Sequence, residues 1–201
     1  MLLSMGAEEE IRKQLAGFPD RTAVSIVTDI DNYVPVLRGV VGFSSENGIK
    51  CIYVTCTIPA RVVLEQLAGT NINPDNVFFI DSISHMVGSS GEDRAQVLFV
   101  ESPTMLEGIM IKVDTWLKKI KDGKRLVFLD SVSTLAMHNE GPLLSEFLHY
   151  FITNLRGRGI RVVVLSVTGQ VPEEVETVLR LVCDETVILK GEESAGEEKD
   201  A

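Results

Sequence analysis

Apolar residues in this chain fall into short unbroken runs that alternate with stretches of helical spacing. The clearest run is Leu-Val-Phe-Leu at 126–129, which is followed directly by Asp130. An unbroken run is typical of a parallel strand covered by helices on both faces, because a strand with one face in water alternates apolar and polar residues. Residues 125–130 are therefore predicted to form a central strand. The run Val-Val-Val-Leu at 162–165 predicts a second central strand at 161–167.

The remaining apolar pattern predicts strands and helices in regular alternation. Further strands are expected at 23–28, 50–56, 77–81, 96–100 and 186–189. Helices are expected at 8–15, 34–43, 59–68, 102–122, 141–155 and 172–181. This order predicts an α/β fold with a mostly parallel sheet, helices on both faces and right-handed crossovers. The polar stretch 82–95 contains Gly-Ser-Ser-Gly at 88–91 and is expected to be a flexible loop, not a phosphate site.

Length and composition place these elements in one domain. The chain has 201 residues, of which 45% are hydrophobic and 24% are charged, enough for one sizeable core. We expect a single α/β domain over residues 1–190, which includes the short N-terminal helix at 8–15. Residues 191–201 carry five acidic side chains and one lysine and have no apolar face. They are expected to form an acidic flexible tail.

The net charge and the cysteines of the chain indicate which kinds of partner it binds and in which cellular compartment it lies. The net charge is −10 and the 19 basic residues are scattered, which argues against nucleic acid as a main partner. No apolar run approaches the roughly twenty residues that span a bilayer, so no membrane association is expected. The three cysteines lack metal-ligand spacing and fit free thiols in a reducing cytoplasm, and the three histidines are far apart in sequence. We therefore expect a cytoplasmic protein.

Asp130 and Ser131 are the first candidates for chemistry, because ligands of open α/β sheets bind beyond the carboxyl ends of the strands. Thr28, Asp29 and Asp31 follow the first predicted strand and would lie at the same edge. These five residues form a candidate ligand-binding group, with no catalytic residue and no metal site assigned. Three acids at one edge could hold Mg²⁺ or Ca²⁺. The simpler interpretation is an Asx turn after the first strand and a cap formed by Asp130 and Ser131.

The segment Leu-Val-Phe-Leu-Asp-Ser-Val-Ser-Thr-Leu at 126–135 resembles the Walker B segment of RecA-fold ATPases, most closely in the KaiC-like branch of the P-loop NTPase superfamily. The order of the predicted strands between Arg21 and Lys190 is similar to that of the family. The resemblance implies a three-layer RecA-like fold with a mostly parallel central sheet. It also implies that competent members bind ATP and Mg²⁺ and that self-association into rings or filaments is common.

The chain departs from this family at two parts that catalysis requires. A phosphate loop needs glycines, so that main-chain N–H groups approach the phosphates, and a lysine. The corresponding residues 28–35, Thr-Asp-Ile-Asp-Asn-Tyr-Val-Pro, contain neither. Asp29 and Asp31 would repel a triphosphate by several kcal/mol at about 4 Å. The family's catalytic Glu pair follows the second strand, where this chain has Thr57 and Ile58, neither of which is a general base near neutral pH.

The sequence therefore favours a non-catalytic KaiC/RecA-like domain, a pseudo-ATPase that needs no cofactor and serves as a regulatory or protein-interaction module in signalling. A protein partner or a homo-oligomer is expected. The alternative is an ATP-binding protein or ATPase with an unorthodox phosphate-binding loop, in which Arg21, Arg38 or Arg61 contacts the phosphates and Mg²⁺ is required. A third hypothesis is an enzyme or sensor for another small ligand, such as a cation held by the three acids at the sheet edge.

Overall fold

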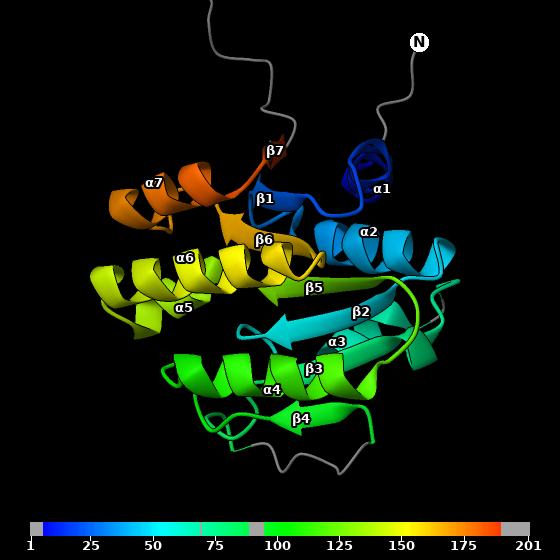
Figure 1. The fold of residues 1–201 in the computed structure, drawn as a ribbon, viewed down its shortest axis with the longest axis horizontal. Coiled ribbons are helices and arrows are strands. Elements are labelled where there is room, and N and C mark those ends of the chain that lie inside the picture. Colours follow the sequence, from blue (N-terminus) through cyan, green and yellow to red (C-terminus); the bar gives the residue numbers. More distant parts are fainter. Residues whose placement is uncertain (1–5, 69, 89–94, 190–201) are drawn as a thin grey trace, which may run out of the picture.

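The computed structural model of the chain describes residues 6–68, 70–88 and 95–189. In this part seven strands form one sheet in the order β4-β3-β2-β5-β6-β1-β7, and every neighbouring pair is parallel (Figure 1). The strands are β1 (Ala23–Thr28), β2 (Lys50–Thr55), β3 (Val77–Asp81), β4 (Val97–Phe99), β5 (Arg125–Asp130), β6 (Arg161–Val167) and β7 (Glu185–Leu189). The expected parallel sheet is confirmed, and β5 is its central strand.

Helices cover both faces of the sheet, which gives three layers (Figure 1). They are α1 (Ala7–Gly17), α2 (Tyr33–Glu46), α3 (Ala60–Leu67), α4 (Leu106–Lys119), α5 (Val132–His138), α6 (Gly141–Gly157) and α7 (Glu173–Val182), with a short 3-10 helix η1 (Pro74–Asn76). One core cluster joins α1, α2 and α3 to one face of the sheet. The other joins α4, α5, α6 and α7 to the opposite face.

The unbroken apolar run of β5 follows from this coverage. Leu126 and Phe128 belong to the core cluster under α1, α2 and α3, whereas Val127 and Leu129 belong to the cluster under the other four helices. All four side chains are fully buried. Because both faces of the strand are covered by helices and shielded from water, residues 126–129 are all apolar, and the strand ends at Asp130.

The main differences from the predicted elements concern a short helix and a helix start. α5 is not among the predicted helices, because its first residues, Val132, Ser133 and Thr134, have low helix propensity. Packing against the core offsets this, since Val132 and Ser133 are buried. The prediction that the long helix before β5 begins at Ser102 is wrong: α4 begins at Leu106, after a turn in which the N–H of Met105 donates to the Ser102 carbonyl at 3.0 Å.

Two expectations fall wholly or partly outside the described residues, namely the acidic tail at 191–201 and the Gly-Ser-Ser-Gly segment, of which only Gly88 is described. Within the described ranges, no helix is long and apolar enough to cross a membrane. The three cysteines are free thiols, as expected, and two of them are buried.

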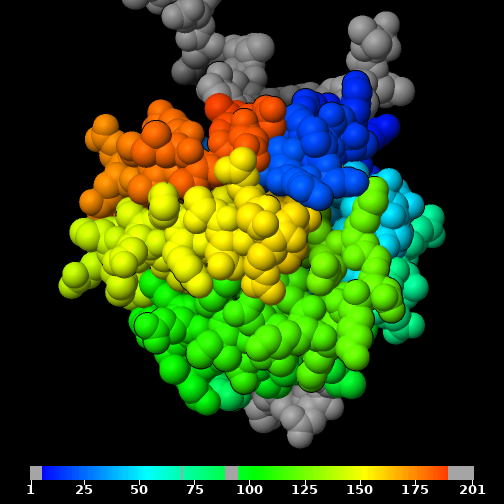
Figure 2. All heavy atoms as spheres, in the orientation of Figure 1, coloured from blue at the N-terminus to red at the C-terminus, as the bar shows by residue number. Residues whose placement is uncertain are grey.

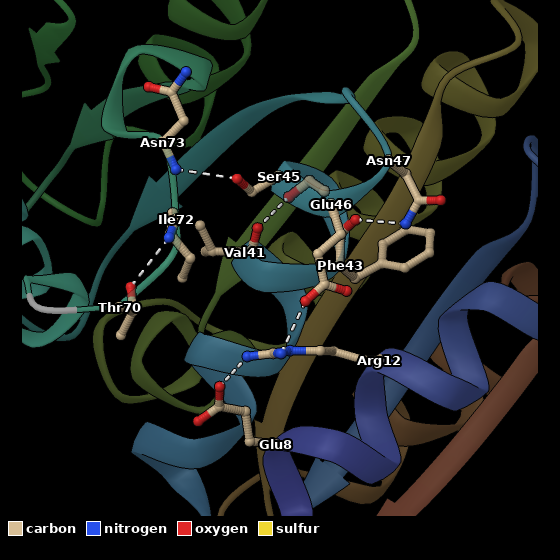
Figure 3. Close-up of polar contacts among 11 residues, drawn as sticks. Glu8, Arg12, Val41, Phe43, Ser45, Glu46, Asn47, Thr70, Ile72 and Asn73 are labelled. Carbon is tan, nitrogen blue, oxygen red and sulfur yellow. Dashed lines mark hydrogen bonds and ion pairs between the residues drawn. The ribbon is translucent and has the colours of Figure 1, made fainter.

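α1 is attached to the body of the fold by close packing on α2. A Cβ atom at Gly39 of α2 would lie 2.8 Å from the Glu8 carbonyl oxygen and 2.9 Å from Cβ of Ile11, so only glycine permits this approach. Beside this contact, the Arg12 guanidinium lies between the carboxylates of Glu8 and Glu46 (Figure 3). Its Nη1 donates to Glu46 Oε1 at 2.9 Å. This packing fixes the chain that leads from α1 into β1.

Candidate functional site

The carboxyl edge of the sheet, on the left in Figure 1, contains two buried carboxylates. Thr55 at the end of β2 pairs with Asp130 of β5 on one side and with Asp81 of β3 on the other. Asp130 is 0% exposed and Asp81 is 1% exposed. These carboxylates therefore lie at the edge where an α/β sheet binds ligands. The hydrogen bonds that each carboxylate accepts determine whether it is available to a ligand.

Both carboxylate oxygens of Asp130 accept hydrogen bonds from tyrosine hydroxyls. The hydroxyl of Tyr33, the first residue of α2, donates to Oδ1. The hydroxyl of Tyr53, in β2, donates to Oδ2 at 2.6 Å. Tyr53 is fully buried, and its ring centroid lies 4.8 Å from that of Phe128. The carboxylate is thus enclosed between aromatic side chains from two different elements.

Burial raises the pKa of Asp130 from its ordinary value of 3.8 to about 6, and hydrogen bonds from Tyr33, Tyr53 and Thr57 oppose this rise. Desolvation, followed by the negative charge of Asp130, raises the pKa of both tyrosines above the ordinary value. The two hydroxyls therefore remain protonated donors at physiological pH. Because Asp130 is also 0% exposed, a ligand or a metal ion reaches its carboxylate only if one of the side chains that cover it moves away.

Three hydroxyl groups lie next to one another beside Asp130. Thr57 Oγ1 is 2.8 Å from Thr134 Oγ1 and 3.2 Å from Ser131 Oγ. Ser131 Oγ also accepts the N–H of Thr134 at 3.2 Å and so caps the start of α5, which agrees with the simpler sequence interpretation. Thr57 occupies the position that the resemblance assigns to a catalytic glutamate. An alcohol is too weak a base to take a proton from water near neutral pH.

The connection from β1 to α2 is a tight turn of four residues, 29–32. Asp29 Oδ1 accepts the N–H of Asn32 at 2.8 Å, and Oδ2 accepts Nδ2 of Asn32 at 3.3 Å. The N–H of Tyr33 donates to the Ile30 carbonyl at 3.2 Å. The Asx-type turn expected at Asp29 is therefore present, and two main-chain N–H groups are used within the turn.

The five candidate residues are brought to one edge but not into one group. Asp130 and Ser131 follow each other at the end of β5, and Thr28 and Asp29 do so at the end of β1. Thr28 is fully buried, whereas Asp31 is exposed on the turn. Among residues 6–68, 70–88 and 95–189, no three or more side chains of the metal-ligating types lie together. The hypothesis of a cation held by three acids has no support in these residues.

Asp81 has a structural role. Its carboxylate accepts the N–H of Ala60, the first residue of α3, at 2.7 Å. It also accepts the N–H groups of Ile83 and Ser84 at 3.0 and 2.8 Å and the Ser84 hydroxyl at 2.7 Å. Asp81 thereby joins the start of α3 to the loop after β3, and these bonds occupy its oxygens.

The basic residues of the ATP-binding alternative do not converge on Asp130. Nε of Arg38 donates to the Gln66 carbonyl at 3.0 Å, and Arg61 pairs with Glu65 at 2.7 Å. Arg21 precedes β1 and therefore lies at the opposite edge of the sheet, where the strands begin. Arg21 therefore cannot share one phosphate site with Asp130, and a role for Arg21 in an unorthodox phosphate site stays a prediction for the other edge.

The sequence reasoning missed Tyr33 and Tyr53, the two residues that bind Asp130. One signal was available for Tyr53, because a tyrosine within a largely apolar strand must find a partner for its buried hydroxyl. Identifying Asp130 as that partner requires knowing that β2 and β5 are neighbours, which is a property of the sheet order.

The fold is similar to those of two solved structures. The KaiC-like protein PH0186 from Pyrococcus horikoshii OT3 is 15% identical with a TM-score of 0.63, over 90% of this chain and 76% of that chain. The flagellar accessory protein FlaH from Methanocaldococcus jannaschii is 16% identical with a TM-score of 0.61, over 92% of this chain and 77% of that chain. No protein-family model and no curated protein matches the sequence. At these identities the likeness concerns the fold alone, and the chain has the three-layer α/β RecA-like fold.

Proposed function

We propose that this chain is a non-catalytic RecA-like domain that acts by binding another protein, as a regulatory or interaction module. The observation that carries the proposal is the environment of Asp130. By resemblance this residue would bind Mg²⁺ beside a nucleotide, yet it is fully buried and accepts two tyrosine hydroxyls instead. One of them, Tyr33, is the first residue of α2, where a phosphate loop would lead into its helix.

The turn before α2 supports the same conclusion. It contains neither glycine nor lysine, and Asp29 and the Ile30 carbonyl already accept the N–H groups of Asn32 and Tyr33. Phosphate binding needs free main-chain N–H groups and a positive charge. With Thr57 in place of a general base, both phosphate capture and water activation lack the groups they require.

Calorimetric titration with ATP tests this part of the proposal. We expect no saturable heat that depends on Mg²⁺ at ATP concentrations up to about 1 mM, the upper end of ordinary KM values, and no release of phosphate above the buffer rate. Paired titrations with Mg²⁺ and with EDTA isolate the Mg²⁺-dependent component. The proposal is contradicted if ATP binds in a Mg²⁺-dependent manner and Asp130→Asn abolishes this binding. The control variant Asp75→Asn, on the exposed η1 helix, would leave such binding intact.

The surface that we assign to the partner is the groove between α4 and α6, on the face shown in Figure 2. The groove has a volume of about 690 Å³. Three of its apolar side chains are more than half exposed: Ile111 at 63%, Leu143 at 54% and Tyr150 at 55%. An exposed apolar patch of this kind, rimmed by polar residues, is typical of a protein-binding site.

The charges around this groove specify the chemistry of the partner. Glu107 and Glu146 line it and form no ion pair with any described residue, whereas Asp114 pairs with Arg158 at 2.5 Å. Two unpaired carboxylates beside an apolar groove fit a protein segment with apolar side chains flanked by lysine or arginine. A second copy of this chain fits less well, because its net charge is also −10.

Photo-crosslinking tests the groove. A benzophenone side chain placed at the exposed position of Leu143 is activated in an extract of the source cells, and the cross-linked peptide is sequenced. We expect an apolar peptide flanked by basic residues, and a severalfold lower yield when Glu146→Lys is added, because the reversed charge repels it. Glu185→Lys, the same change on exposed β7, is the matched control. Cross-linking mainly to a second copy of this chain, or a yield that Glu146→Lys leaves unchanged, contradicts the assignment.

A further inference from the structure

A second cavity lies at the amino edge of the sheet, the edge opposite Asp130, and neither the resemblance nor the proposed function uses it. It has a volume of about 380 Å³, within the range of small-molecule sites. Its walls are formed by the segments that lead into β1, β2, β5 and β6, four strands whose starts meet at this edge. The residues that concern its chemistry are Asp20, Arg21, Lys124, Arg125, Gly159 and Arg161.

Positive charge is concentrated in this cavity although the chain as a whole is acidic. Four basic side chains and one acid line it, a local charge of +3 in a chain of net charge −10. The single acid, Asp20, pairs with Lys124 at 2.7 Å, and the hydrogen bond from Lys124 lowers the pKa of Asp20. Asp20 also forms a long ion pair with Arg161 at 3.9 Å, whereas Arg21 and Arg125 form no ion pair with the described residues. Charges of one sign in a concave site attract the opposite ion.

Arg161 is the fixed cation of the cavity. Its side chain is 3% exposed, and its Nη groups donate to the carbonyls of Leu15, Phe18 and Pro19 at 2.9, 2.7 and 2.9 Å. Neutral carbonyls hold the guanidinium in place but do not neutralise its charge. Its Nε is buried and has no hydrogen-bond partner among the described residues. Its one counter-ion, Asp20, is exposed, lies 3.9 Å away and is shared with Lys124. A buried cation that is only partly neutralised in this way is stabilised by an anion beside it.

Arg21 is the adjustable cation of the cavity. It is exposed and forms no hydrogen bond or ion pair with the described residues. Its guanidinium lies beside Gly159, where a Cβ atom would be 3.4 Å from Nε of Arg21. A guanidinium presents a planar fork of donors that matches phosphate oxygens. Arg21 is therefore free to turn toward an anion that Arg161 already attracts.

We infer that this cavity binds the phosphate group of a small phosphorylated molecule. A phosphate dianion matches the three arginine charges better than a single carboxylate does. Arg21 and Arg161 contribute guanidinium groups beside the anion, and Lys124 contributes an ammonium group. A nucleic acid is a poorer match, because a long phosphate backbone would also meet the acidic remainder of the surface.

The test is calorimetric titration of the full chain with inorganic phosphate and with pyrophosphate, at constant ionic strength maintained with chloride and without Mg²⁺. We expect saturable binding of one pyrophosphate per chain. Arg21→Ala should weaken it about tenfold, the effect of one charge-assisted hydrogen bond. Asp20→Asn should tighten it, because the only acid in the cavity is removed. Arg61→Ala on α3, which removes the same charge near the opposite edge, should have no effect.

Chemical shifts of single residues distinguish binding in this cavity from nonspecific attraction between the protein and the anion. Amide NMR signals of Gly123 and Gly159, which line the cavity, should shift with the same concentration dependence as the heat. Absence of saturable binding, or equal weakening by Arg21→Ala and Arg61→Ala, overturns the inference. The same variants separate the two edges when ATP is the titrant. Heat that is independent of Mg²⁺ and that Arg21→Ala weakens belongs to this cavity, not to Asp130.

Discussion

Replacing Asp130 by Asn is expected to remove about 3 kcal/mol of pH dependence from the free energy of unfolding. The carboxyl group has a pKa of about 6 in the folded protein and an ordinary value of 3.8. Between these values the unfolded chain has lost its proton and the folded chain has kept it, so stability falls as the pH rises. The contribution of Asp130 is complete below about pH 4 and absent above about pH 6. Urea unfolding of both proteins from about pH 4 to about pH 7 measures the difference.

The comparison between the two proteins removes the contribution of other groups. Asp20, for example, has a pKa lowered from its ordinary value of 3.8, so its contribution to stability is lost as the pH falls below about 4. Asn in place of Asp130 keeps the size of the side chain and one acceptor for a tyrosine hydroxyl, so the variant should fold. Asp75→Asn on the exposed η1 helix is the matched control and should follow the wild-type profile. If wild type and Asp130→Asn show parallel profiles, Asp130 does not titrate as a buried acid.

Tyr53→Ala is expected to lower the free energy of unfolding by about 3–5 kcal/mol, the range for removing a buried aromatic side chain. Tyr53 is fully buried, and its ring centroid lies 5.4 Å from that of Phe79 and 4.8 Å from that of Phe128. Alanine leaves a cavity between these rings. It also removes one of the two hydroxyl donors to Asp130. Urea denaturation at neutral pH measures the loss.

Tyr53→Phe separates the contribution of the hydroxyl group to stability from that of the packed ring. The ring remains, and only the hydrogen bond to Asp130 is lost, which should cost about 1.5–3 kcal/mol because the acceptor is charged. Since this bond lowers the pKa of Asp130, its removal should also raise that pKa. Tyr150→Phe on the exposed side of α6 is the control and should change stability by less than about 0.5 kcal/mol. If Tyr53→Phe is as mild as Tyr150→Phe, the hydroxyl does not support the buried carboxylate.

The two edges of the sheet have opposite electrostatic character. At the carboxyl edge the central acid is enclosed by Tyr33 and Tyr53, and an acidic turn follows β1. At the amino edge, Arg21 and Arg161 line a cavity with little compensating negative charge. In this protein an anion is therefore attracted to the edge opposite the one where α/β sheets ordinarily bind phosphates.

Strand and helix alternation could be predicted because it depends on local periodicity. The limits of β1 and β6 agree with the predicted 23–28 and 161–167, since an apolar run ends where a strand leaves the core. α5 could not be predicted in the same way. Its propensity is weak, and the burial of Val132 and Leu135 against the rest of the core is what stabilises it.

The sequence by itself determined that the chain forms a layered α/β sheet and that the turn after its first strand lacks glycine and lysine. Only the tertiary structure decided what Asp130 binds: Tyr33 is 97 positions away in the chain and Tyr53 is 77 positions away. The same holds for the meeting of Arg21 and Arg161 at the amino edge. The physical reason is that strand order and register follow from burying both faces of the sheet at once. No local pattern of residues encodes which strands become neighbours.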